Sequence, residues 1–155
     1  MTNGSEEYFR ALGEKFGFEV APGDDGACFI AAEGAPGVIV RANDAAVRME
    51  LSAVIAAELP EGVAYSDMLD LLGLALGPLF DAPGIGRDPE SGAIVLYALF
   101  PFPTTTPADF AEAVPQFLDR ARGLADHLAL DSRTPSDLLN NAIYIYMMEV
   151  TAIMA

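Results

Sequence analysis

The sequence predicts an α+β fold in which an antiparallel sheet of about five strands packs against helices. Three short apolar segments separated by turn residues fill positions 27–57, which is typical of strands joined as hairpins. A second pair of such segments fills positions 85–102. Capped helical patterns stand before, between and after the two groups. The expected order is therefore α-βββ-α-ββ-α, followed by an extra C-terminal helix.

The first expected helix begins at Ser5, whose hydroxyl can cap the N-terminus, and ends at Gly17. Phe9, Leu12 and Phe16 recur at steps of three and four residues, so they fall on one face. This apolar stripe predicts that the helix packs against the sheet by one side.

Three strands are expected at residues 27–33, 37–42 and 45–57. The third has the clearest pattern, because every odd position from 47 to 59 is apolar, a period of two residues. Turns centred on Ala35-Pro36 and on Asn43-Asp44 would pair the three strands antiparallel.

These two turns divide the strand residues between the two faces of the sheet. The face expected in the core carries Phe29, Ala31, Val38, Val40, Val47, Met49, Leu51 and Ile55. The opposite face is expected to carry Cys28, Ile30, Ala32, Ile39, Arg41, Arg48, Glu50, Ser52 and Val54. One wholly apolar face is what a half-buried antiparallel sheet requires.

The helical pattern at residues 65–80 is apolar around almost its whole circumference. Such a helix is usually buried on all sides, and a chain of 155 residues has little interior to bury it in. We therefore expect a homodimer in which this helix lies at the interface between subunits. The interface residues would be Leu69, Leu72, Leu76 and Leu79.

The last part of the sequence predicts a hairpin and two helices. The hairpin at residues 85–102 turns at Asp88-Pro89. Thr106 caps the next helix, which continues to about residue 130 and which Pro115 should kink or restart. A final helix is expected at 135–154, with an apolar stripe formed by Leu139, Ile143, Tyr146, Val150 and Ile153.

The composition predicts one acidic domain spanning residues 1–155. The net charge of −15 argues against binding to nucleic acid or to anionic membranes, which would repel the chain. No apolar run reaches the roughly 18 residues of a membrane span, so no membrane insertion is expected. Cys28 is the only cysteine and cannot form an internal disulfide, and the N-terminus lacks a signal pattern. A cytoplasmic location is expected.

The sequence shows no clear pattern of catalytic residues. His127 is the only histidine, and it lies between apolar positions of an amphipathic helix without a nucleophile nearby in sequence. Cys28 stands in the middle of a strand, where a small buried residue is more common than a nucleophile. We expect no enzyme activity, no metal and no organic cofactor.

Several segments together resemble the class I type III secretion chaperones of bacteria, the Tir chaperone family, over roughly residues 5–130. These segments are "FRALGEKFGF", "GACFIAAEG", "RMELSAVIAAELP", "DMLDLLGLALGPLF", "DPESGAIVLYALFPF" and "FAEAVPQFLDRARGLADHL". The chain departs from the family pattern at Gly73, where a polar residue such as Asn commonly follows the paired leucines, and in its additional C-terminal helix at 134–155.

The resemblance implies a homodimeric bacterial chaperone. Such a protein binds the N-terminal segment of a secreted effector in the cytoplasm and keeps it secretion-competent without nucleotide. One alternative is an interaction or regulatory domain of the same fold without a secretion role. Another is a small-molecule-binding or enzymatic domain, although the predicted inner face has no convergent polar groups.

The sheet face turned away from the core is the expected effector-binding surface. Its residues would be Ile30, Ala32, Ile39, Arg41, Arg48 and Val54. The competing interpretation is that the last helix, or the second subunit, covers this patch.

Overall fold

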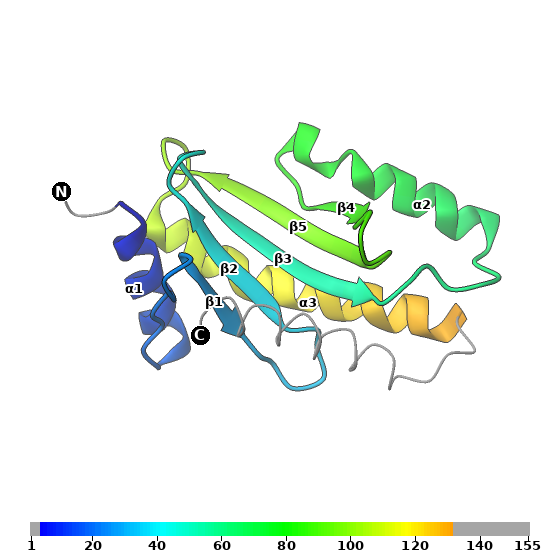
Figure 1. Ribbon diagram of the computed structural model, residues 1–155, viewed down its shortest axis with the longest axis horizontal. Coiled ribbons are helices and arrows are strands. Elements are labelled where there is room, and N and C mark those ends of the chain that lie inside the picture. The colour runs from blue at the N-terminus through cyan, green and yellow to red at the C-terminus, as the bar shows by residue number, and fades with distance from the viewer. Residues whose placement is uncertain (1–3, 132–155) are drawn as a thin grey trace.

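The computed structural model describes residues 4–131 as a five-stranded antiparallel sheet backed by helices (Figure 1). The spatial order of the strands is β1-β2-β3-β5-β4. The strands are β1 (Ala27–Ile30), β2 (Val38–Asn43), β3 (Arg48–Ala56), β4 (Gly84–Arg87) and β5 (Ile94–Pro101), and the helices are α1 (Gly4–Phe16), α2 (Tyr65–Ala75), the 3-10 helix η1 (Gly77–Phe80) and α3 (Pro107–Asp131). The predicted α+β class and strand number are confirmed. The expected last helix lies outside the described residues.

The main core lies between one face of the sheet and helices α1 and α3. Figure 1 shows α3 running behind the sheet, and its first turns lie beside α1, where the Tyr8 hydroxyl donates a hydrogen bond to the Thr105 carbonyl at 2.5 Å. Met49, Leu51 and Ile55 of β3 are almost fully buried in this core, as their odd-position pattern predicts. Burial of each such side chain stabilises the fold by roughly 1.5–3 kcal/mol.

Helix α3 begins with the predicted cap. The Thr106 hydroxyl accepts a hydrogen bond from the Asp109 N–H at 3.1 Å and donates one to the Asp109 carboxylate at 2.7 Å. Pro115 was expected to kink the helix or restart it, and the restart is wrong, because α3 continues unbroken to Asp131. Buried side chains on both sides of the proline, Val114 and Phe117, hold the two halves against the same core.

The turn between β2 and β3 is longer than predicted. Instead of a two-residue turn at Asn43-Asp44, β2 ends at Asn43 and residues 44–47 form the turn. The Asn43 side-chain oxygen accepts a hydrogen bond from the Ala46 N–H at 3.0 Å. Val47 adopts a left-handed φ of 55° and is 50% exposed, so its predicted place in the core is wrong.

The strand register explains which face assignments hold. Val40 pairs with Leu51 rather than with Val47, an even shift of four residues that leaves both strands on their predicted faces. On the other side, Val40 pairs with Cys28 rather than with Ala31, an odd shift of three residues. The odd shift inverts β1, so Cys28 and Ile30 lie in the main core.

Within residues 4–131, no helix combines the length and apolar character that crossing a bilayer would require.

Candidate functional site

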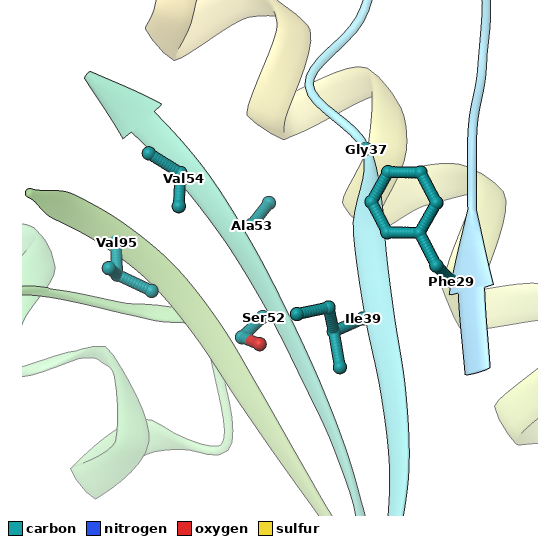
Figure 2. Close-up of a pocket in the computed structure, with 7 residues that line it drawn as sticks. All are labelled: Phe29, Gly37, Ile39, Ser52, Ala53, Val54 and Val95. Carbon is teal, nitrogen blue, oxygen red and sulfur yellow. The ribbon is translucent and has the colours of Figure 1, made fainter. Parts of the chain in front are cut away.

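The face of the sheet opposite the main core, here called the outer face, carries a shallow apolar hollow with about 10 Å³ of free space (Figure 2). Its lining residues come from four strands and the approach to β2: Phe29, Gly37, Ile39, Ser52, Ala53, Val54 and Val95. Ile39 and Val54 are 3% and 6% exposed and form the floor, whereas Phe29 and Val95 are half-buried at the rim. The hollow is shallow, so it offers an apolar contact surface rather than a pocket that encloses a side chain.

Phe29 reaches its place because Gly37 has no side chain. A Cβ atom at Gly37 would lie 2.0 Å from the Phe29 Cζ atom, so the aromatic ring covers the glycine directly (Figure 2). With Ala27 and Ile39, Phe29 forms a small apolar cluster separate from the main core. The sequence prediction placed Phe29 in the core and therefore missed it.

A charged groove of about 270 Å³ continues from the hollow and shares Ile39 and Ser52 with it. The Glu50 carboxylate accepts hydrogen bonds from the Arg48 Nε atom at 2.7 Å and the Asn43 amide at 2.9 Å. Arg41 is exposed in this groove and has no ion-pair partner among residues 4–131. The groove therefore offers one free guanidinium beside an apolar depression.

The structure brings together four of the six predicted effector-binding residues. Ile39, Arg41, Arg48 and Val54 line the hollow and the groove. Ile30 lies in the main core, and Ala32 packs against that same core. Their assignment to the outer face is wrong because of the inverted register of β1.

A second apolar surface, here called the α2 surface, is formed by α2 and η1. No residue of α2 is buried in the single chain, so the prediction of a helix buried on all sides does not hold within one subunit. The exposed fractions are 49% for Leu69, 59% for Leu72, 53% for Leu76, 77% for Leu79 and 77% for Phe80. Contiguous apolar exposure of this kind marks an interaction surface.

The surroundings of Cys28 and His127, the two residues considered for catalysis, are those of residues with structural roles. Burial raises the pKa of the Cys28 thiol to about 12, which makes a nucleophilic thiolate rare near neutral pH. The His127 Nε2 atom lies 3.3 Å from an Asp67 carboxylate oxygen and joins the C-terminal part of α3 to the first turn of α2. In the described part of the chain, no three His, Cys, Asp or Glu side chains gather closely enough to hold a metal ion.

Comparison with known proteins gives a family match. A model of the Tir chaperone protein (CesT) family matches residues 9–125. No curated protein matches the chain.

Solved structures with the same fold come from complexes of two proteins. A chain of the HopA1–SchA chaperone–effector complex is 19% identical, with a TM-score of 0.66, and the match covers 79% of this chain and 94% of that one. A chain of the ExsC–ExsE complex is 17% identical, with a TM-score of 0.64 and coverages of 82% and 96%. A chain of the ExoU–SpcU complex from the type III secretion system of Pseudomonas aeruginosa is 16% identical, with a TM-score of 0.58 and coverages of 81% and 97%.

Proposed function

Because the chain belongs to the Tir chaperone protein (CesT) family, whose model matches residues 9–125, we propose that it is a cytoplasmic chaperone of a type III secretion system. It binds the N-terminal segment of a secreted effector and keeps that segment secretion-competent. The family match is the observation that carries this proposal. The apolar surfaces described above fit a protein that binds a segment of another chain.

The proposed effector-binding surface is the outer-face hollow together with the groove beside it. Phe29, Ile39, Val54 and Val95 offer apolar contacts, and Arg41 offers a charge with no ion-pair partner among the described residues. A bound segment therefore needs apolar side chains to cover the hollow and an acidic group or carbonyl oxygens to reach Arg41.

The proposed homodimer uses the α2 surface. Leu69, Leu72, Leu76 and Leu79 are each about half exposed or more in one subunit. Pairing two copies of this surface would remove these side chains from water, which is favourable by about 25 cal/mol per Å² of buried apolar area. A second copy presents the same surface, so a twofold interface is self-complementary.

Affinity capture from the native bacterium tests the function. A tagged chain should co-purify with a protein that the bacterium secretes, and removal of that protein's N-terminal segment should abolish capture. Deletion of the chaperone should stop secretion of the partner. A captured partner that is not secreted would make the chain an interaction domain of the same fold and would contradict the secretion role.

The binding surface is tested by Arg41→Glu, with Arg120→Glu as the matched control. Both arginines are exposed and neither has an ion-pair partner among residues 4–131, but Arg120 lies on α3, away from the outer face. Arg41→Glu should weaken binding of the captured partner about tenfold or more, because it replaces an attraction by a repulsion. Equal binding by both variants would place the site elsewhere.

A further inference from the structure

The outer face lacks a helical cover within the described chain. Helices α1 and α3 contribute buried residues to the main core, and Leu71 and Leu74 of α2 pack against that same core. The separate cluster on the outer face contains only strand residues, Ala27, Phe29 and Ile39. An apolar hollow in the middle of a sheet therefore stands without a partner among residues 4–131.

The sequence beyond α3 has the composition of a partner for such a face. Among residues 138–155 only Glu149 is charged, although charged residues make up 20% of the chain. The pattern predicts a helix at 135–154, here called the tail, with Leu139, Ile143 and Val150 on one side and Asn141 and Thr151 on the other. A helix this rich in apolar residues needs an apolar surface to cover its stripe. The tail lies outside the described residues.

The end of α3 stands within reach of the outer face. The contact between His127 and Asp67 holds the last turns of α3 beside the start of α2, which follows β3 along the chain. Figure 1 shows α3 ending at the same end of the sheet as the arrowhead of β3. A helix of 20 residues is about 30 Å long, and the nine residues of β3 span about the same length.

The tail is an addition to the fold shared with known chaperones. The family match ends at residue 125. The structural matches span 94–97% of the similar chains but leave about a fifth of this chain uncovered, since they cover 79–82% of it. Those chains form the fold without such an addition. The tail is therefore not needed for the shared fold and is available to bind the outer face.

We propose that the tail docks on the outer face of its own subunit, with its apolar stripe over Phe29, Ile39, Val54 and Val95. The same subunit is the favoured site because only a few residues join Asp131 to the tail. A short tether gives an effective concentration on the order of millimolar, far above that of free chains in solution.

The consequence for cargo rests on the function proposed above. An effector that uses the hollow must displace the tail, so the tail lowers the apparent affinity by the fraction of molecules in which it is docked. Docking itself is independent of cargo and can be measured on the purified protein.

Photo-crosslinking of the full chain tests the docking. Photoreactive benzoylphenylalanine in place of Phe29 should crosslink to a peptide within residues 135–154, identified by mass spectrometry. A mixture of isotope-labelled and unlabelled chains should give crosslinks within one chain only. Crosslinks between labelled and unlabelled chains would assign the tail to a second copy, and the absence of tail peptides would leave it off this face; either result overturns the proposal.

The matched variants Val150→Asp and Thr151→Asp test the apolar stripe. The two residues are adjacent and both β-branched, and each change adds one negative charge, but only Val150 belongs to the stripe. Val150→Asp should abolish the crosslink and raise the fluorescence of an added apolar dye several-fold, whereas Thr151→Asp should match the unmodified protein. Equal behaviour of the two variants, or unfolding caused by Val150→Asp in circular dichroism, would contradict a separable docked tail.

These measurements separate the two proposals. Both are made without cargo, so their failure leaves the chaperone function untouched. A failed capture of a secreted partner, in turn, leaves the crosslinking result standing.

Discussion

Val47 shows how one residue can carry backbone strain without a packing role. Its φ of 55° lies in the left-handed region, which a β-branched residue adopts at a cost of roughly 1–2 kcal/mol. Since the side chain is 50% exposed, little apolar contact would be lost on its removal. Val47→Gly should therefore raise the free energy of unfolding by about 1 kcal/mol in urea titration. Val47→Ala keeps the strain, and an equal gain from that variant would contradict this explanation.

Gly37 is the residue on which the outer-face hollow depends. Gly37→Ala would push the Phe29 ring away and should destabilise the protein by about 1–3 kcal/mol. The cost should shrink in a Phe29→Ala background, because the two sites are coupled. Gly123→Ala is the control: it lies inside α3 with nothing within 4 Å of the added Cβ atom, and it should stabilise by about 0.5–1 kcal/mol. Equal costs of Gly37→Ala in both backgrounds would contradict the contact.

The buried thiol of Cys28 predicts low reactivity and a defined pH dependence. Burial raises its pKa from 9.0 to about 12 in the folded chain. The stability linked to this neutral thiol is fully present below pH 9 and is lost as the pH rises through about 12. Iodoacetamide at pH 8 should label Cys28 only after unfolding in urea. Cys28→Ala should flatten the decline of stability above pH 9, and rapid labelling of the native protein would contradict burial.

At the level of elements, the sequence was sufficient for the order of helices and strands but not for the turn lengths. Turn residues such as Asn43-Asp44 mark where a strand ends, yet the chain takes four residues to turn there. The predicted faces of β2 and β3 are correct because the difference between the predicted and the observed register is an even number of residues. The face of β1 could not be read, since Cys28, Phe29 and Ile30 are all apolar and the pattern offers no alternation.

The residues of the candidate site were also predictable only where the sequence pattern distinguishes the two faces of the sheet. Arg41 and Arg48 were placed correctly because their polar side chains mark the solvent side of β2 and β3. Phe29 was missed, although one signal was present: a glycine at position 37 leaves room for a large side chain on the neighbouring strand.

The exposed apolar residues of helix α2 lead to a prediction about dimer formation. Leu72→Glu should convert a dimer into a monomer near 16.4 kDa in analytical ultracentrifugation. The subunit should remain folded, because Leu72 is 59% exposed before any partner binds. Ser66→Glu adds the same charge in the exposed first turn of α2 and should leave the dimer intact. A wild-type protein that is already monomeric at micromolar concentration would contradict the proposed interface.

The whole molecule combines a net charge of −15 with an exposed apolar surface on α2 and η1 and a shallow apolar hollow on the outer face. Like charges keep such a molecule soluble while its binding surfaces stay available. We expect its stability to come from packing alone. Exhaustive chelation and dialysis should therefore leave the Tm unchanged, measured by circular dichroism against an untreated sample. A large drop that a single added ion reverses would contradict this expectation.

The short strand β4 has a consequence for the behaviour of the protein in concentrated solution. It pairs only with residues 94–97, so residues 98–101 of β5 have no strand partner on that side within residues 4–131. A bare strand edge is a template for fibril growth. Here Pro101 withholds an N–H from that edge, and Pro78 and Pro83 line the same recess beside Leu99. We therefore expect this edge to resist fibril formation because its prolines disfavour pairing with a further strand, and not because another strand of the chain already covers it.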